Sequence, residues 1–249
     1  MMLYFDLFLE FNHDCVDNTI LDCIIRKKKG YVCVVDGNVL AYATKDNPYK
    51  KIINEGLINI CDGSSIALLA GKIYNKKFKT YTGPDLFACY IKKELKQLFL
   101  GNTEQNLNLL KTRFEDLKYP TKLFKYMSLP FKGVDDFDYL SIAELINKEK
   151  PDIIWVSLGA PKQELFIGKL YPLINQGVLI AIGAAFNLFL DDENNKRAPL
   201  FMRNLHLEWL FRIFLEPKRV GLRALNYLFL LPKLVIKERR KLVVKNNNK

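Results

Sequence analysis

The 249-residue sequence contains few of the residues that build metal centres or disulfide networks. It has two histidines and five cysteines, and no two cysteines form a C-x-x-C pair, which argues against a zinc site. The N-terminus lacks a positively charged segment and a cleavage site, so we expect no signal peptide. The cysteines lie in apolar stretches and are expected to be buried, reduced thiols of a cytoplasmic protein: Cys15, Cys23, Cys33, Cys61 and Cys89.

Long apolar runs and the common glycine-rich nucleotide motifs are also missing. The longest apolar run near the C-terminus, Tyr227–Leu231, is far shorter than the roughly 20 residues that span a bilayer. The sequence contains neither G-x-x-x-x-G-K-[ST] nor a G-x-G-x-x-G after an expected strand. These absences argue against a P-loop NTPase and against a standard dinucleotide-binding fold.

The excess of positive charge is confined to the C-terminal end of the chain. Residues 196–249 hold 14 Lys and Arg against three acids, a net charge of +11 that equals the net charge of the whole chain. This asymmetry predicts an anionic partner: nucleic acid, a membrane surface or a phosphorylated substrate. Aromatic and leucine residues are interleaved with the basic ones, which is typical of a helix in a membrane interface. Within this helical segment we expect Pro232 to kink or end a helix.

Apolar strand patterns alternate with amphipathic helix patterns through most of the remaining chain. Asp152–Ser157 and Val178–Ile182 are apolar almost throughout, as in strands whose two faces are both covered. Thr103–Leu117 has the spacing of an amphipathic helix. The alternation predicts an α/β fold, Rossmann-like, with a mostly parallel sheet and helices on both faces. We expect residues 1–195 to form this core and residues 196–249 to form a basic, helical C-terminal appendage.

Five of the expected strands end in a glycine beside a small or polar residue. Glycine at such a turn lets a ligand approach the backbone closely, and the helix that follows points its first N–H groups toward the same crevice. The pattern predicts a site for a phosphorylated ligand such as a nucleotide. The five turns are Asp36-Gly37-Asn38, Asp62-Gly63-Ser64, Gly101-Asn102, Gly159-Ala160 and Gly183-Ala184.

Asp62 is the candidate for chemistry among these turns. It follows the apolar run Leu57–Cys61, which places it at the carboxyl end of a strand, where parallel α/β sheets bind ligands. The alternative is an ordinary Asp-Gly turn with Ser64 or Ser65 as the N-cap of the next helix.

Several multi-residue motifs, in order and over nearly the whole chain, resemble those of the WecG/TagA/CpsF bacterial glycosyltransferases. The resemblance implies an inverting, metal-independent transfer of a sugar from a UDP-sugar to a polyprenyl-diphosphate-linked sugar, with no cofactor. It also implies a peripheral enzyme on the cytoplasmic face of the cell membrane, whose appendage closes the site and meets that membrane. A homo-oligomer is left open. The motifs are Asp62-Gly63-Ser64, Gly83-Pro84-Asp85-Leu86, Leu158–Glu164, Ile182–Phe186, Lys196–Pro199, Leu207–Arg212, Glu216-Pro217 and Arg219.

The resemblance further implies roles for individual residues. Asp62 matches the proposed catalytic base, which would deprotonate the attacking sugar hydroxyl and contribute ~10²–10⁴-fold to the rate. The charge on the leaving UDP would be stabilised by the glycine turns and by Arg212, Arg219 and Arg223. The other residues expected in the substrate site are Asp36, Asn38, Gly63, Ser64, Thr80, Gly101, Gly159, Lys162, Gln163, Glu164, Gly183 and Asn187.

The sequence departs from the family pattern on the donor side of the expected crevice. The family's Thr-x-Asn falls on Val34 and Asp36 without gaps, whereas a shift of two residues restores Asn38. The arginine that often precedes the Gly-Pro-Asp motif falls on Thr80, and the aspartate of a Phe-Asp pair falls on Asn187. We therefore expect an altered preference for the donor sugar rather than a loss of activity.

Two other interpretations compete with these roles. Asp136-Phe137-Asp138 matches the D-x-D with which many glycosyltransferases hold a metal, but acidic residues are also favoured before a helix. The basic C-terminal segment also fits a nucleic-acid-binding module or a non-catalytic scaffold at the membrane. Phosphate neutralisation alone, however, would not explain five glycine-ended strands around an aspartate. The donor sugar, the acceptor and the linkage are not identified by the sequence.

Overall fold

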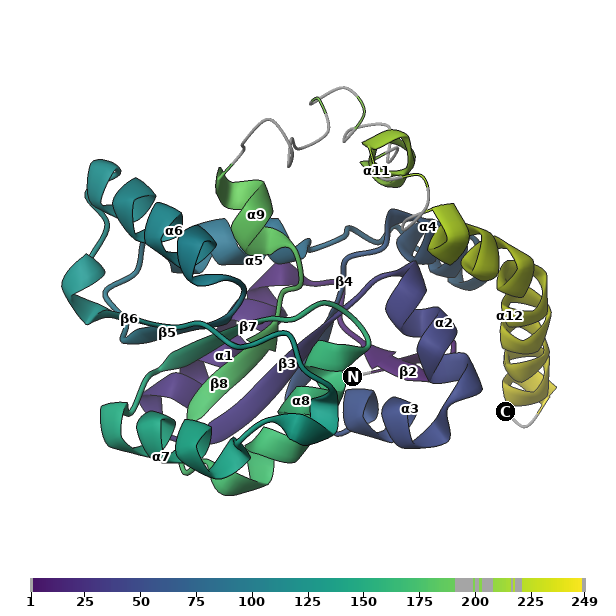
Figure 1. The fold of residues 1–249 in the computed structure, drawn as a ribbon. Helices are drawn as coiled ribbons and strands as arrows, with labels where there is room; N and C mark the ends of the chain where they lie inside the picture. Colours follow the sequence, from purple (N-terminus) through teal and green to yellow (C-terminus); the bar gives the residue numbers. More distant parts are fainter. Residues whose placement is uncertain are drawn as a thin grey trace.

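A parallel six-stranded sheet with helices on both faces forms the centre of the molecule (Figure 1). This computed structural model describes residues 2–190, 199, 202, 208–215, 217 and 221–247. The strands are β1 (Met2–Tyr4), β2 (Leu7–Leu9), β3 (Lys29–Val35), β4 (Ile58–Cys61), β5 (Gln97–Gly101), β6 (Phe124–Met127), β7 (Ile153–Ser157) and β8 (Gly177–Ala181). The α-helices are α1 (His13–Ile25), α2 (Gly37–Lys45), α3 (Asn47–Asn54), α4 (Ser64–Tyr74), α5 (Gly83–Tyr90), α6 (Glu104–Asp116), α7 (Tyr139–Glu149), α8 (Lys162–Leu170), α9 (Ala185–Leu190), α11 (Glu208–Leu215) and α12 (Leu222–Asn247).

The large sheet has the strand order β4-β3-β8-β7-β5-β6, and all of its neighbouring pairs are parallel. Strands β1 and β2 form a separate antiparallel hairpin. Three 3₁₀ turns, Thr121–Leu123, Val134–Asp136 and Tyr171–Leu173, complete the connections of the core. The predicted α/β fold with a parallel sheet is thereby confirmed.

Side chains of the sheet alternate between two apolar cores, one on each face. Along β3, Tyr31, Cys33 and Val35 join the core formed with α2, α3, α4, α7 and α8. Val32 and Val34 point the other way, into the core formed with α1, α5, α6 and α9. This alternation follows from the two-residue period of a strand, and it explains why a run such as β3 is apolar at nearly every position.

The connections leave the carboxyl edge of the sheet toward opposite faces. After β3, β4 and β7 the chain enters α2, α4 and α8, which pack on the first face. After β5 and β8 it enters α6 and α9, which pack on the second face. Ligands of open α/β sheets bind where neighbouring connections diverge in this way. By this criterion a ligand crevice is expected at the boundaries of β8 with β3 and with β7, and at the boundary of β7 with β5.

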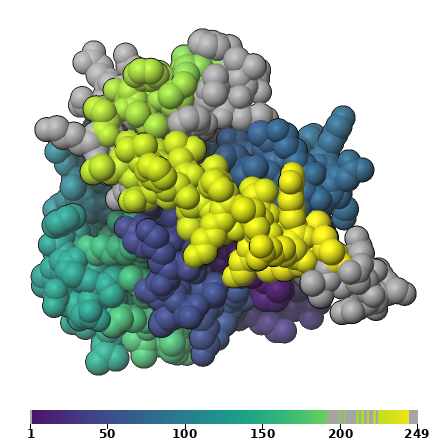
Figure 2. All heavy atoms as spheres, turned by 90° about the vertical axis from the view of Figure 1, so that its right-hand side faces the viewer, coloured from purple at the N-terminus to yellow at the C-terminus, as the bar shows by residue number. Residues whose placement is uncertain are grey.

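The described part of the C-terminal segment is largely helical, as predicted, and α12 lies along α2 and α4 on the outside of the core (Figures 1 and 2). Pro232 lies inside α12 and does not end it. Proline removes one backbone donor and bends a helix, and the axis of α12 changes direction in Figure 1. Within the described ranges, no helix is long and apolar enough to cross a membrane.

The cysteines correct one expectation. Cys23, Cys33 and Cys61 are buried free thiols, as predicted, but Cys15 and Cys89 are exposed. Both exposed thiols lie on helices, α1 and α5, that bury a different face, with Val16 and Ile20 of α1 and Leu86 and Phe87 of α5 in the core. An apolar sequence neighbourhood does not distinguish the inner from the outer side of such a helix.

Asn59, which is fully buried in β4, supports a prediction about stability. Its Nδ2 donates to the carbonyl oxygens of Phe8 (3.1 Å) and Ile53 (2.7 Å), and its Oδ1 accepts from the amide of Cys33 (3.3 Å). We expect Asn59→Ala to lower the free energy of unfolding by about 2–4 kcal/mol, because buried backbone groups lose their partners. Asn108→Ala, on the exposed side of α6, should change it by less than about 0.5 kcal/mol in the same urea titration. Equal effects of the two substitutions would contradict this.

Candidate active site

Asp62 and Asp36 stand side by side at the carboxyl edge of the sheet. The register of β3 and β4 pairs Val35 with Cys61, so the next residue of each strand is an aspartate beside the other. The amide of Asp62 donates to the carbonyl oxygen of Val35 at 3.0 Å, which ties the two turns together. The sequence left open whether Asp36 or Asn38 stands next to Asp62. The structure places Asp36 there, and Asn38 lies in the first turn of α2.

Both carboxylates are half-buried and held in place by backbone donors. Oδ1 of Asp62 accepts from the amide of Gly83 at 3.0 Å, at the start of α5. Oδ1 of Asp36 accepts from the amide of Val39 at 2.8 Å and caps α2. Val34, which aligns with the family's threonine, is buried beside Gly83: a Cβ added to Gly83 would lie 3.4 Å from the Val34 side chain. The threonine hydroxyl of the family pattern is therefore replaced here by a methyl group. The orientation of Asp62 is therefore fixed from a neighbouring loop, as a general base requires.

Helix α4 begins directly after Asp62. Gly63 is its N-cap residue, and no described side chain caps this helix end. The predicted site residues Gly63 and Ser64 are both half-buried here. The N-terminus of a helix carries partial positive charge and favours anions. A carboxylate and a helix N-terminus thus lie together at one turn, which suits a base next to a phosphorylated ligand.

Gln163 joins the turns that follow β7 and β8. Its Oε1 accepts from the amide of Gly159 at 3.1 Å and from the amide of Gly183 at 2.9 Å. Both glycines have positive φ, 75° and 56°, which aims their N–H groups at the same oxygen. That the glycine turns donate to the leaving group stays a prediction. Two of these N–H groups are used to hold the turns together.

Glu164 continues this polar chain into the interior. Its Oε1 accepts from Nε2 of Gln163 at 2.8 Å, and its Oε2 accepts from the hydroxyl of Tyr49 at 3.0 Å. Glu164 has no exposed surface, and burial raises the pKa of its carboxyl to about 7. The resemblance implied that Gln163 and Glu164 contact the donor. In this structure both side chains are buried and form hydrogen bonds to protein groups, so they hold the turns of the site in place.

Three asparagines meet between the turn after β5 and the start of α9. Oδ1 of Asn187 accepts from Nδ2 of Asn102 at 2.7 Å and from Nδ2 of Asn106 at 3.3 Å. Gly101 precedes this cluster with a φ of 98°, and a Cβ there would lie 2.8 Å from the carbonyl oxygen of Ser157. Asn187 and Gly101 are thus brought to the same edge as Asp62, but on the other side of β7 and β8.

Thr80 and Lys162 lie at the margins of this edge. The Thr80 carbonyl oxygen lies 3.0 Å from Nε2 of His13, and the His13 ring stacks on Tyr81 at 4.2 Å between centroids. Lys162, in the first turn of α8, lies over the ring of Phe137 at 4.9 Å. The Thr80 backbone and the Lys162 ammonium therefore have partners in the protein, and their contact with a substrate stays a prediction.

The D-x-D sequence has a structural role in the fold. Oδ1 of Asp138 accepts from the amide of Ser141 at 3.0 Å and caps α7, while Asp136 lies in a 3₁₀ turn. In the part of the chain that the structure describes, no three acidic, histidine or cysteine residues are grouped as a metal site would need. The arginines predicted to complete the site lie outside the described residues: Arg219 in full, and Arg212 and Arg223 for their side chains.

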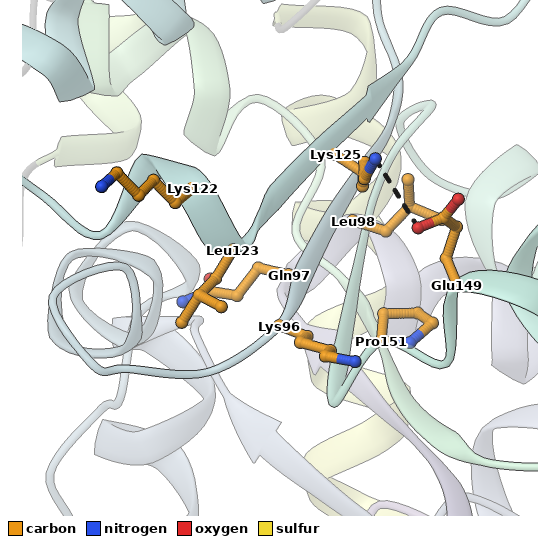
Figure 3. Close-up of a pocket in the computed structure, with 8 residues that line it drawn as sticks. All are labelled: Lys96, Gln97, Leu98, Lys122, Leu123, Lys125, Glu149 and Pro151. Atoms are coloured by element: carbon orange, nitrogen blue, oxygen red, sulfur yellow. Dashed lines mark ion pairs between the residues drawn. The ribbon is translucent and has the colours of Figure 1, made fainter.

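A separate hollow lies at the opposite edge of the sheet, where β5 and β6 begin (Figure 3). Its walls carry an ion pair of 3.7 Å between Lys125 and Glu149. Parallel sheets bind ligands at their carboxyl ends, so we do not assign the candidate site to this hollow. It is lined by Lys96, Gln97, Leu98, Lys122, Leu123, Lys125, Glu149 and Pro151.

The fold and the carboxyl-edge turns define an α/β protein with a parallel sheet and a fixed aspartate at the carboxyl edge of that sheet. The chain belongs to the WecG/TagA/CpsF glycosyl transferase family, whose model matches residues 8–244. It is therefore a glycosyltransferase, as the sequence motifs predicted.

Several curated relatives carry one name, N-acetylglucosaminyldiphosphoundecaprenol N-acetyl-beta-D-mannosaminyltransferase. The relative from Bacillus spizizenii is 26% identical over 211 residues, which cover 82% of this chain and 77% of the relative. The one from Bacillus subtilis is 27% identical over 202 residues, covering 79% and 75%. The one from Staphylococcus aureus strain NCTC 8325 is 24% identical over 195 residues, covering 77% and 74%.

Some residues that shape the site carried no signal in the sequence. The sequence pattern places Tyr49 on a helix among apolar residues, yet its hydroxyl donates a hydrogen bond to Glu164. The sequence indicates Asn102 only as part of a turn, and its hydrogen bond to Asn187 joins residues 85 positions apart. A buried acid in an otherwise apolar helix face, as at Glu164, is the one pattern that would have indicated a partner.

The raised pKa of Glu164 predicts a pH-dependent stability. Between its ordinary value of 4.5 and its folded value of about 7, the folded protein holds a proton that the unfolded chain has released. Stability therefore falls as the pH rises through this window, by at most about 3 kcal/mol. Glu164→Gln is neutral at every pH, so its stability relative to wild type should increase from pH 4 to pH 8 in urea titrations. Glu115→Gln, an exposed change on α6, should show no such trend. A constant difference for Glu164→Gln would contradict the assignment.

Proposed function

We propose that this glycosyltransferase moves a sugar from a UDP-sugar donor to a polyprenyl-diphosphate-linked sugar, with inversion and without a metal. The observation that carries the proposal is the fixed Asp62 carboxylate, beside Asp36 and at the start of α4. The relatives' shared name supports the acceptor class, since it describes transfer to N-acetylglucosaminyldiphosphoundecaprenol. Cell-surface polysaccharide assembly is the process that such an acceptor serves.

The proposed reaction is a single displacement at the anomeric carbon of the donor. The acceptor hydroxyl oxygen forms a bond to that carbon while the bond from the carbon to the UDP phosphate oxygen breaks. The hydroxyl proton goes to the Asp62 carboxylate, and the departing UDP takes the bonding electrons. Helix N-termini and cations at the carboxyl edge then stabilise the new negative charge. Arg212, Arg219 and Arg223 are proposed as those cations.

We also propose that the protein lies peripherally on the cytoplasmic face of the membrane. The acceptor is a lipid, and helix α12 exposes apolar residues beside basic ones, as interfacial helices do. The exposed apolar residues of α12 are Leu222, Leu225, Leu228, Phe229, Ile236 and Val243. The exposed basic residues are Lys233, Lys237, Arg239 and Arg240.

Replacement of the proposed base tests the reaction. We expect Asp62→Asn to lower the rate of sugar transfer by ~10²–10⁴-fold with little effect on thermal stability, because the amide cannot take the proton. The measurement is transfer from a radiolabelled UDP-sugar to a short polyprenyl-diphosphate sugar. Asp116→Asn, an exposed change at the end of α6, is the matched control and should transfer at the wild-type rate. Wild-type transfer by Asp62→Asn would show that Asp62 is not the base.

The donor preference is tested with a panel of UDP-sugars under the same conditions. Asp36, Thr80 and Asn187 replace family residues on the donor side, so we expect a UDP-N-acetylhexosamine or related hexose other than UDP-N-acetylmannosamine to be used best. The reactions are run with and without EDTA, and the chelator should leave the rate unchanged. Strict use of UDP-N-acetylmannosamine would contradict the altered preference, and loss of transfer in EDTA would contradict metal independence.

A further inference from the structure

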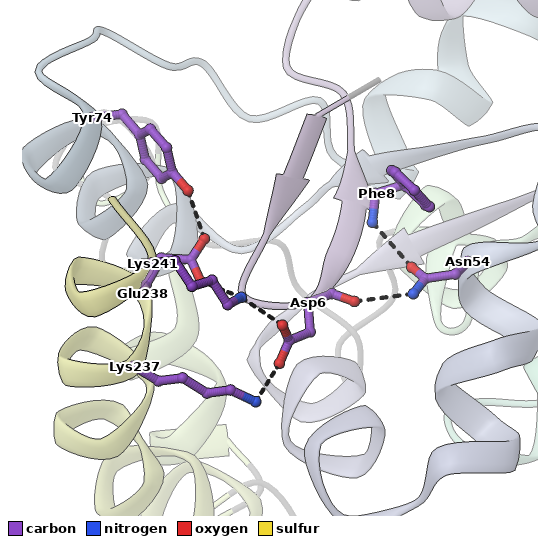
Figure 4. A network of polar contacts seen from close by, with 7 residues as sticks. All are labelled: Asp6, Phe8, Asn54, Tyr74, Lys237, Glu238 and Lys241. Carbon is purple, nitrogen blue, oxygen red and sulfur yellow. Dashed lines mark hydrogen bonds and ion pairs between the residues drawn. The ribbon is translucent and has the colours of Figure 1, made fainter. Parts of the chain in front are cut away.

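Helix α12 packs on the core through Leu234 and is anchored further by two sets of contacts, of which the first is a polar network near its C-terminal end (Figure 4). Glu238 is buried there with an exposed fraction of 1%. Its two carboxylate oxygens accept from the Tyr74 hydroxyl at 2.7 Å and from the Lys241 ammonium at 2.9 Å. Lys237 donates to Asp6, in the turn between β1 and β2, at 2.6 Å. This network fixes the helix to α4 and to the N-terminal hairpin.

The second anchor is Tyr227, which contacts both turns of the candidate active site. Its side chain is buried, and its hydroxyl oxygen lies 3.1 Å from Oγ of Ser65 in the first turn of α4. Its ring packs on Gly37 at the start of α2. Gly37 directly follows Asp36, and Ser65 lies three residues after Asp62. One side chain of the C-terminal segment therefore contacts the residue next to Asp36 and a side chain three residues after Asp62.

The shape of the Asp36 turn is matched to this ring. A Cβ added to Gly37 would lie 2.8 Å from Cδ1 and 2.9 Å from Cε1 of Tyr227, well inside the 3.5–4.0 Å or so of a favourable carbon–carbon contact. Gly37 does not have positive φ, so its turn does not need a glycine for backbone reasons. The glycine is needed because the Tyr227 ring occupies the place of a side chain.

We propose that Tyr227 is a positioning residue, which sets the geometry of the Asp36 and Asp62 turns when α12 is docked. As a role in sugar transfer, this rests on the proposed function. The ring limits movement of the Asp36 turn, and the hydroxyl holds the first turn of α4 that follows Asp62. Since Asp62 and Asp36 lie on neighbouring strands, both contacts act on the same pair of carboxylates.

The first test uses amide hydrogen exchange of residues 36–42 and 62–67 in the full chain without substrate. We expect Tyr227→Ala and Gly37→Ala each to raise exchange in both segments by about five- to thirtyfold. Gly37→Ala should have no further effect in the Tyr227→Ala background, where the methyl group meets no ring. Asn226→Ala, an exposed neighbour on α12, is the control and should leave exchange unchanged. Unchanged exchange of either segment in Tyr227→Ala would overturn the proposal, as would additive effects of the two substitutions.

The second test measures sugar transfer by the same variants. Tyr227→Ala should lower kcat by about five- to thirtyfold, because the base is misplaced, and should also raise the KM for the donor, because the Asp36 turn lies on the donor side. Tyr227→Phe keeps the ring and should retain most of kcat. A lower melting temperature with an unchanged kcat per folded molecule would show a purely structural role and overturn the proposal. If the wild-type chain transfers no sugar, the proposed function fails, and the exchange measurement alone decides whether Tyr227 positions the turns.

Discussion

The hydrogen bonds of Gln163 hold two turns at the carboxyl edge of the sheet together. Loops at the carboxyl ends of parallel strands usually have few partners of their own, because they lie at the surface. Here one side-chain oxygen accepts from the amides of two such loops, at Gly159 and Gly183. Glu164 and Tyr49 extend this contact into the core. The turns at the centre of the site are therefore connected to a buried chain of hydrogen bonds. Loss of one side chain in this chain would leave its neighbours without a hydrogen-bond partner.

The parts of the fold that depend on local patterns were predictable from the sequence. Apolar runs and helical spacing predicted the parallel sheet with helices on both faces and placed Asp62 at a strand end, whereas its role as a base rests on the family resemblance. Contacts between distant segments were not predictable, because no local pattern encodes them. The partners of Gln163 and the strand register beside Asp62 both depend on strand order. The predicted burial of Cys15 was wrong for a related reason, because tertiary packing decides which face of a helix is buried.

The charge of the C-terminal segment illustrates the same limit. The sequence assigns its entire excess of positive charge to an anionic partner. In the structure, Lys237 and Lys241 bind Asp6, and Lys241 also binds Glu238, so part of this charge serves the docking of α12. Exposed pairs of this kind contribute little to stability, but Glu238 is buried and its loss would leave its partners unsatisfied. Charge counts therefore overstate what remains for a membrane or a substrate.

The docking of α12 also bears on how a lipid-linked acceptor would reach a base at the sheet edge. Helix α12 packs on α2 and α4, the two helices that begin directly after Asp36 and Asp62. Its outer side carries exposed Leu and Phe residues, while its inner side carries Tyr227. A membrane contact on the outer side would thus lie one helix diameter from the turns, about 10–12 Å. Under the proposed function, the helix that would meet the membrane would then also shape the turn that carries the proposed base, so that membrane docking and catalytic geometry would share one element.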